Sequence, residues 1–474
     1  MTAPRIDRFR LIGKGEGPGS PASGRLRPHL GWVALTAGVL LTLFLRYLKG
    51  YTSYGFPATD WATRAVIFRS LIDGHVREFL ATASQGDSMI LRAPIALVTG
   101  LLGGSDVAVY RAVAVPALLA AGWLGLWCVE RMRDWHAGTT ARGLTLGLLI
   151  ASPIVISDLT ESHSEELLGA VLCVAAMACA SQGRWRPTAL LLGLAMANKH
   201  WALLVALPIL LVLPQRRVAA ALVASAITAL TIVPSMLVGS ISAATSQATT
   251  TGAIGEFNLS QVWWLFGRRT PGGVVAPHWL QLVAHPLIVA LCLLVALVWW
   301  GARRPRGLSE GLLLMAFLLA IRALLDPADN EYYLLPMLTT LATWEAVCAR
   351  RLPLAAIAWT AFQALWFGPI GGHLAPDAAN VVYLAFSLPA LALLGLRALA
   401  PQRLRRLDLA RLARRAPGLL APRGASSSST STPTGGDGGQ PATISSLGKW
   451  LSRSQPSSPT TTRSSMRTPV TPGR

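Results

Sequence analysis

Charged residues are scarce in this chain. Asp, Glu, Lys and Arg make up 14% of the 474 residues, whereas hydrophobic residues make up 52% and the mean hydropathy is +0.48. Soluble domains carry about 25% charged residues. The shortage argues against a soluble globular protein and favours a polytopic integral membrane protein.

Acidic residues are fewer than basic ones: 22 Asp and Glu stand against 42 Lys and Arg, which gives a net charge of +20. So basic a chain suggests a nucleic-acid partner at first reading. Most of its basic residues, however, lie in short loops between apolar runs or near the C-terminus, which suits membrane orientation better. We therefore expect membrane lipids and no nucleic acid as partners.

Cysteine is also rare, and its spacing predicts neither a redox pair nor a disulfide framework. The five cysteines all fall inside apolar runs and form no CxxC pair; they are Cys128, Cys173, Cys179, Cys292 and Cys348. We interpret them as small buried or lipid-facing residues. No cleavable signal peptide is evident, so the first apolar run is expected to remain as an anchor.

Long apolar runs recur along the chain, and about 20 such residues cross a bilayer. The expected fold is all-α with about 12 spans, at 30–48, 107–129, 143–157, 165–182, two short spans within 188–213, then 218–238, 280–300, 309–325, 332–348, 353–370 and 379–399. The run 188–213 is interrupted at Asn198, Lys199 and His200, which predicts a hairpin. The expected divisions are a basic N-terminus (1–29), a transmembrane domain (30–400) and a disordered Ser/Thr/Pro-rich tail (401–474).

The loops between the spans predict the orientation. Arginines fill every second short loop, at 131–142, 184–186, 216–217, 303–306 and 350–351, whereas the short loops at 158–164, 326–331 and 371–378 carry no Lys or Arg. The positive-inside rule then places both termini in the cytoplasm of a cell-membrane protein. Two long loops, about 49–106 and 239–279, fall on the extracytoplasmic side.

Ionisable and aromatic residues gather at the predicted outer ends of the spans, where charges are costly and usually functional. They are Asp60, Arg111, Asp158, His163, Glu165, Glu166, Lys199, Arg322, Asp329, Tyr332 and Tyr333. Arg and Lys at the interface suit a lipid phosphate, and carboxylates beside them suit a general base. One outward-facing polar site is the simplest interpretation.

Each of these residues also has a structural interpretation. Asp60 could cap a helix, and Arg111 could extend to the interface. A solvated turn explains the His163 to Glu166 segment equally well, and the tyrosine pair could belong to an aromatic belt. Lys199, at a hairpin tip within the membrane, favours a function.

Four stretches together resemble the GT-C superfamily of polyprenyl-phosphate-dependent glycosyltransferases, and most closely glycosyltransferase family 87. They are ATDWATRAVIFRSLIDGH (58–75), SDLTESHSEELLGAVLC (157–173), ALLLGLAMANKHWALLVALPILLVLPQRR (189–217) and DPADNEYYLLPMLTTLATWE (326–345). The similarity covers roughly 30–400. The sequence departs from the family at Arg64 and Ala65, where an aromatic residue is common.

The resemblance implies an inverting hexosyltransferase with an extracytoplasmic site. Its donor would be a polyprenyl-phosphate sugar, often mannose, and its acceptor a lipid or glycan. Asp60 would be the catalytic base or the carboxylate that orients the acceptor, with Asp158, His163, Glu165 and Glu166 as a second motif. Lys199, Arg322 and Arg111 would bind the donor phosphate, and Asp329, Tyr332 and Tyr333 would contact donor or acceptor. No clear DxD motif is present, so no metal and no cofactor are expected.

Two other functions remain open. Twelve spans with both termini inside also fit a transporter or flippase for a lipid-linked saccharide, although no internal repeat relates the two halves. A non-catalytic scaffold whose tail recruits partners is the third possibility, but it leaves the charged outer residues unexplained.

Overall fold

The computed structural model describes residues 67–83, 89–160, 163–238, 262–270, 273–275, 277–302, 307–327, 331–370 and 373–400. These residues all belong to the first of two units, Met1–Leu409 and Ala410–Arg474. Four features of the sequence interpretation therefore lie outside the described residues: the first predicted span, the tail, Asp60 and Asp329.

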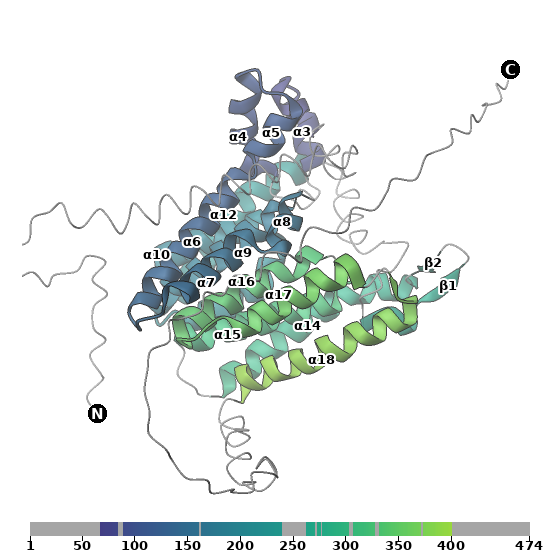
Figure 1. The fold of residues 1–474 in the computed structure, drawn as a ribbon. Coiled ribbons are helices and arrows are strands. Elements are labelled where there is room, and N and C mark those ends of the chain that lie inside the picture. The colour runs from purple at the N-terminus through teal and green to yellow at the C-terminus, as the bar shows by residue number, and fades with distance from the viewer. Residues whose placement is uncertain are drawn as a thin grey trace, which may run out of the picture. The chain divides into compact units, whose positions relative to one another are not determined.

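Helices dominate the described part of the chain (Figure 1). The α-helices are α3 (Val76–Ala83), α4 (Met89–Leu101), α5 (Asp106–Ala112), α6 (Val115–Arg133), α7 (Thr139–Ala151), α8 (Pro153–Thr160), α9 (Ser164–Ser181), α10 (Trp185–Asn198), α11 (Leu203–Val212), α12 (Arg217–Val238), α14 (His278–Gly301), α15 (Leu308–Leu325), α16 (Leu335–Thr343), α17 (Leu354–Leu365) and α18 (Pro376–Leu399). Short 3-10 helices are η2 (His200–Ala202), η3 (Val262–Phe266) and η4 (Glu331–Leu334), and π-helical turns are η5 (Trp344–Cys348) and η6 (Trp366–Ile370).

Seven helices in the described residues are long and apolar enough to cross a membrane. They are Asp106–Arg133, Thr139–Leu159, Ser164–Ser181, Arg217–Val238, Leu282–Gly301, Leu308–Leu325 and Pro376–Leu399. Helices also occur at the remaining predicted spans after residue 107, but these are shorter. The chain is thus a helical protein with several helices suited to cross a membrane, and the count of twelve spans stays a prediction.

The segment around Lys199 folds back on itself as the sequence predicts. α10 ends at Asn198, Lys199 is extended, and η2 leads into α11. The start of α10 and the end of α11 lie close together, as the guanidinium of Arg216 lies 5.5 Å from the ring centroid of Trp185. Gly183, with φ of +73°, makes the tight turn into α10 that a residue with a side chain would strain. Lys199 therefore lies at the opposite end from Trp185.

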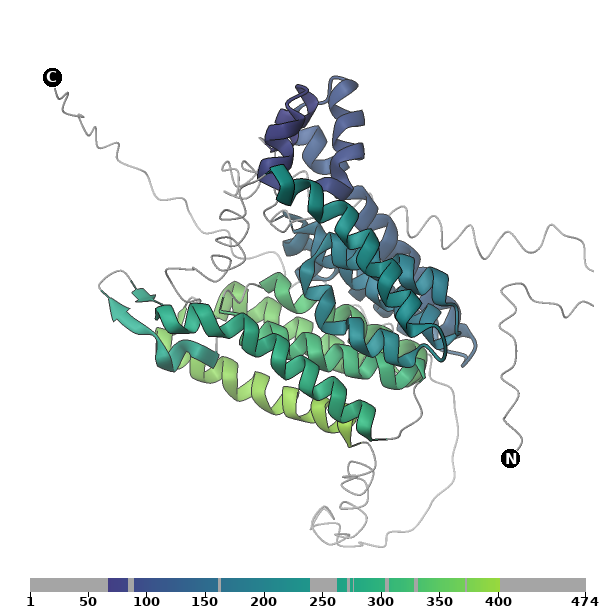
Figure 2. The ribbon, with the colours of Figure 1, turned by 180° about the vertical axis from the view of Figure 1, so that it is seen from behind.

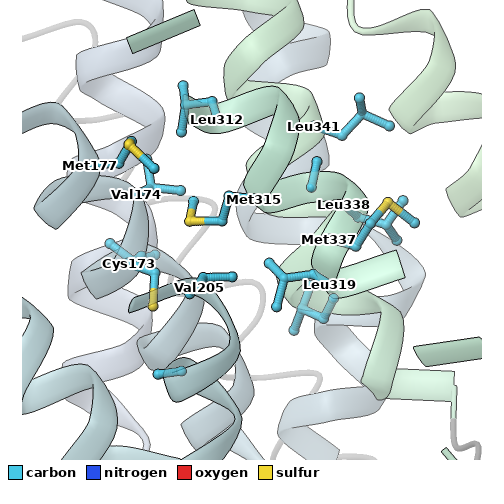
Figure 3. Close-up of a cluster of buried hydrophobic side chains, with 14 of the residues drawn as sticks. Cys173, Val174, Met177, Val205, Leu312, Met315, Leu319, Met337, Leu338 and Leu341 are labelled. Atoms are coloured by element: carbon cyan, nitrogen blue, oxygen red, sulfur yellow. The ribbon is translucent and has the colours of Figure 1, made fainter. Parts of the chain in front are cut away.

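The core lies between α9, α11, α15 and α16, which pack against one another (Figure 1). Figure 3 shows Leu, Met, Val and Cys side chains from these four helices filling the space between them; the labelled ones are Cys173, Val174, Met177, Val205, Leu312, Met315, Leu319, Met337, Leu338 and Leu341. Close packing of this kind holds the four helices in fixed positions relative to one another.

The outer helices present apolar side chains outward. α14 and α18 pack against α15, and α12 packs against α10 (Figure 2). α12 exposes Leu222, Leu230 and Leu237, which are each at least 66% accessible. A large exposed apolar surface is unusual for a soluble protein but is expected of a helix that faces lipid.

Both of the predicted outer loops contain short helices or strands. In the first loop, residues 67–72 are helical, and α3, α4 and the start of α5 form a separate cluster around Phe68, Phe79 and Met89. Gly74, whose φ is +85°, separates the helical residues 67–72 from α3. In the second loop, η3 precedes an antiparallel pair of short strands, β1 (Arg268–Thr270) and β2 (Gly273–Val275).

Candidate functional site

Two buried carboxylates begin α9 and form the centre of the site. Glu165 and Glu166 are both 0% exposed. They occupy the first turn of the helix, where the backbone N–H groups favour negative charge. Adjacent residues on an α-helix point about 100° apart, so the two side chains meet different partners.

Glu165 accepts hydrogen bonds from three other elements of the fold. Arg92 of α4 donates from Nη2, and the ammonium of Lys199 lies 3.2 Å from Oε1. The ring Nδ1 of His163, just before α9, lies 3.2 Å from the same oxygen. Glu165 thereby ties the first predicted outer loop to the tip of the α10–α11 hairpin.

Glu166 pairs mainly with Arg322, near the end of α15. The two guanidinium nitrogens Nη1 and Nη2 each donate to one carboxylate oxygen, both at 3.1 Å. Such a two-pronged contact is stronger and more directional than a single hydrogen bond. Lys199 lies 3.8 Å from Oε1 of Glu166, so it bridges the two carboxylates.

Aromatic rings enclose the Arg322 guanidinium. Its Cζ lies 5.4 Å from the ring centroid of Trp201 in η2 and 4.5 Å from that of Tyr333 in η4. Both distances allow a cation–π interaction. Tyr332 stacks on His163, with ring centroids 3.9 Å apart, and η4 is thereby held against the start of α9.

The hairpin tip approaches α9 closely because α9 carries a glycine there. A Cβ placed on Gly169 would lie 3.0 Å from Cζ2 of Trp201 and 3.1 Å from Nδ2 of Asn198. The Asn198 amide also donates to the backbone oxygen of Glu165 at 2.7 Å. These contacts position Lys199 beside the carboxylates.

A third carboxylate, Asp158 in α8, lies close enough to interact electrostatically with Glu165, Glu166, Lys199 and Arg92. It is 0% exposed, and neither of its carboxylate oxygens has a hydrogen-bond partner among the described residues. Its backbone oxygen accepts from the N–H of His163 at 2.8 Å, which closes the turn between α8 and α9.

The opposite end of the helices is built differently. The Trp135 indole donates to the backbone oxygen of Ala346, and that of Trp344 to the hydroxyl of Ser309. These contacts join loops that the sequence places on the basic side. Arg184 and Arg350, from two of these loops, are exposed. Solvated cations thus lie at one end of the helices and the buried charge cluster at the other.

Most of the residues predicted for the site come together. The residues of the charge cluster are Asp158, His163, Glu165, Glu166, Lys199, Arg322, Tyr332 and Tyr333, joined by Arg92. Asp60 and Asp329 lie outside the described residues. Arg111 lies on α5, next to Tyr110, whose hydroxyl donates to the backbone oxygen of Leu159; its role in phosphate binding stays a prediction.

Arg92 was missed by the sequence interpretation. It is 5% exposed and is the lone charge of α4. A single cation inside an apolar helix is the signal that could have identified it, because such residues usually pair or bind ligands.

The charge cluster holds three cations and three carboxylates in a region with little water. Burying a single ion costs several kcal/mol, about as much as a well-formed pair recovers, so such networks are retained for specificity or function more often than for stability. Rings of Arg and Lys could bind an anionic ligand, and the carboxylates could accept a proton. Among the described residues, no group of three or more His, Cys, Asp or Glu side chains is arranged to hold a metal ion.

No protein-family model matches the sequence, and no curated protein matches it either.

Proposed function

We propose that this chain is an integral membrane glycosyltransferase with a GT-C-like fold of about twelve spans. It moves a hexose, mannose in the simplest case, from a polyprenyl-phosphate donor to an extracytoplasmic lipid or glycan, with inversion at the anomeric carbon. The observation that carries the proposal is the buried charge cluster, which joins Lys199, Arg322 and Arg92 to carboxylates at one end of the helices.

The cations account for recognition of the donor phosphate. Lys199 lies at a helix break and is 12% exposed, and Arg322 and Arg92 approach from two other helices. Glu166 fills the guanidinium fork of Arg322 in this structure. A donor phosphate would therefore share or replace that contact, because both anions bind the same two N–H groups.

The reaction follows from this placement of charges. An acceptor hydroxyl attacks the anomeric carbon while a carboxylate takes its proton, and the bond to the phosphate oxygen breaks on the opposite face of the sugar. Negative charge grows on the leaving polyprenyl phosphate, and Lys199 and Arg322 stabilise it in a site with little water. The resemblance to the GT-C superfamily implies Asp60 as the base, and Asp60 lies outside the described residues.

The side of the membrane is part of the proposal. Exposed arginines mark the end of the helices that we assign to the cytoplasm, together with both termini. The charge cluster then opens to the extracytoplasmic side, which a polyprenyl-phosphate sugar reaches within the bilayer.

Sugar transfer tests the proposal directly. Membranes expressing the chain are incubated with radiolabelled polyprenyl-phosphate-mannose and a panel of lipid acceptors, and the labelled product is counted. We expect transfer by the wild type and a loss of about 100-fold in Lys199→Met, the magnitude typical of removing one charge-stabilising group.

The matched control is Arg184→Met, which removes an exposed cation from the opposite end and should retain full transfer. Equal expression of all three proteins is checked first. Failure of the wild type with mannose and with every other polyprenyl-phosphate sugar tried would contradict the proposal.

A transporter or flippase for a lipid-linked saccharide is the second candidate. The observation that favours it is the chain of paired charges and a histidine within the membrane-spanning helices, an arrangement also used to relay protons in transporters. Reconstituted vesicles separate the two, because a flippase moves the intact labelled lipid between leaflets and releases no labelled sugar.

A further inference from the structure

Asp158 differs from every other buried carboxylate near it. In the part of the chain that the structure describes, both of its oxygens are without a hydrogen-bond partner, whereas the oxygens of Glu165 and Glu166 accept from Arg92, Lys199 and Arg322. The three groups lie within eight residues of one another. Burial alone therefore does not explain the missing partners of Asp158.

A buried carboxylate at the other end of the helices shows how the fold normally treats such a group. Glu345 is 0% exposed and accepts from Arg351 at 2.8 Å and from the backbone N–H groups of Ala355 and Ala356 at 3.3 and 3.0 Å. It caps the start of α17 and neutralises an arginine, which is a structural role.

An unpartnered polar group in a protein interior costs about 1–3 kcal/mol, and more where it is charged. A fold that satisfies Glu165, Glu166 and Glu345 could satisfy Asp158 by the same means. A buried polar group that stays unpartnered at this cost in free energy is typical of functional sites, where a ligand supplies the missing partner.

We propose that Asp158 accepts the proton of the acceptor hydroxyl during sugar transfer, while Glu165 and Glu166 hold the cations in place. This inference rests on the function proposed above and assigns the base to α8. Asp158 is suited to the role because neither of its oxygens accepts a hydrogen bond from the described residues, and the cations Lys199 and Arg92 lie near it.

The step balances without a further reactant. As the acceptor oxygen bonds to the anomeric carbon, its proton passes to a carboxylate oxygen of Asp158. The bond between the anomeric carbon and the phosphate oxygen breaks, and the polyprenyl phosphate leaves with the electron pair. The proton then passes from Asp158 to solvent or to the released phosphate.

An acceptor must first displace part of the cover over Asp158. α8 is packed against α7, α9, α16, α17 and η4. Of these elements η4 is the shortest, at four residues, and it is held to α9 by the stack of Tyr332 on His163. Movement of η4 would uncover the face of α8 against which it packs.

Two measurements on the full chain test the inference together. The first is transfer from radiolabelled polyprenyl-phosphate-mannose by Asp158→Asn, Asp158→Leu, Asp60→Asn and Glu345→Leu, with its dependence on pH. The second is the midpoint of thermal unfolding of the same purified proteins in detergent. Replacing a functional, unpartnered carboxylate should lower transfer and raise the unfolding midpoint. Replacing a structural carboxylate should retain transfer and lower the unfolding midpoint.

We expect Asp158→Asn and Asp158→Leu to lower transfer by about 100-fold or more. Transfer by the wild type should decline at acid pH, because acid protonates its base. The residual transfer of the two Asp158 variants should show no such decline. Asp158→Leu should also raise the unfolding midpoint by about 2 °C or more, since an unsatisfied group is removed. Glu345→Leu should lower the midpoint while transfer per folded molecule is retained.

Three outcomes overturn the inference, and they are distinguishable. An active wild type with an equally active Asp158→Asn refutes the role of Asp158 alone, and inactivity of Asp60→Asn in the same set would move the base to Asp60. A lowered unfolding midpoint in both Asp158 variants assigns the residue to structure. An inactive wild type removes the proposed function itself, and this inference with it.

Discussion

Arg322 and Glu166 are separated by 156 residues and form a fully buried pair, in which both carboxylate oxygens accept from the guanidinium at 3.1 Å. The pair joins α15 to α9, two of the four helices that surround the core. Trp201 and Tyr333 cover the guanidinium on either side. The contact therefore links two core helices at this end and lies at the centre of the proposed phosphate site.

Glu166→Gln should destabilise the protein strongly, because it leaves the Arg322 charge buried without its counterion. Breaking a buried pair from one side costs about 3–5 kcal/mol. The midpoint of thermal unfolding in detergent measures the loss. The double variant Glu166→Met/Arg322→Met should recover much of the stability, since two apolar side chains replace the two charges. Equal midpoints for Glu166→Gln and the wild type would show that the pair does not form.

Arg92→Leu should loosen the first outer loop and leave the main helices intact. Hydrogen bonds to charged groups contribute about 1.5–3 kcal/mol, so backbone hydrogen exchange in α3 to α5 should speed up by about tenfold or more. Exchange in α9 should change little, because Lys199 and His163 still contact Glu165. Hydrogen exchange with mass spectrometry gives both values.

The matched control for this prediction is Arg69→Leu. Arg69 pairs with Asp106 within the same loop unit, and both side chains are partly exposed. Exposed pairs contribute little, so the control should leave exchange nearly unchanged. A uniform increase over the whole chain in Arg92→Leu would mean that Arg92 supports the fold generally.

Much of the helical architecture follows from apolar runs alone. The lengths of the runs located the helices after residue 107. The polar residues Asn198, Lys199 and His200 located the break in the hairpin, because polar and charged side chains are costly within an apolar helix in lipid. The sorting of arginines into alternate loops also predicted that Lys199 and Arg322 would lie at the same end.

The pairing within the charge cluster could not be predicted in the same way. Glu165 and Glu166 are neighbours in the sequence, yet one meets Arg92 and Lys199 and the other meets Arg322. Which partner each one meets depends on the rotation of α9 about its own axis. That rotation is fixed by the packing around Gly169, not by any local signal. For the same reason the unpartnered state of Asp158 appears only in three dimensions.

Gly193→Ala should weaken the contact between α10 and α12. A Cβ at this position would lie 2.8 Å from Cβ of Ile227 and 2.9 Å from the backbone oxygen of Ala224, so the helices would have to separate. Small residues allow such close approach in membrane helices, and overpacking costs about 1–3 kcal/mol. We expect a lower unfolding midpoint.

Gly147→Ala in α7 is the control, because a Cβ there meets no atom within 4 Å. It should be neutral or stabilising by up to about 1 kcal/mol, since alanine favours a helix more than glycine does. If both variants have the same unfolding midpoint, the close contact between α10 and α12 is not formed.

The orientation of the helices can be tested by labelling single cysteines in whole cells. His373, between η6 and α18, and Arg184, before α10, are both exposed but lie at opposite ends of the helices. His373 is near the charge cluster end, because α18 begins close by and its Asp377 accepts from the indole of Trp264, while the neighbouring Trp263 donates to the backbone oxygen of Leu325. The native cysteines are replaced first, so that each variant carries one thiol.

A maleimide that cannot cross membranes should label His373→Cys in intact cells and Arg184→Cys only after the cells are opened. The physical reason is the retention of arginine-rich loops in the cytoplasm during insertion. The reverse pattern would place the charge cluster on the cytoplasmic side. A polyprenyl-phosphate sugar presented outside the cell could not then be its substrate, and a donor on the inner leaflet would have to be considered instead.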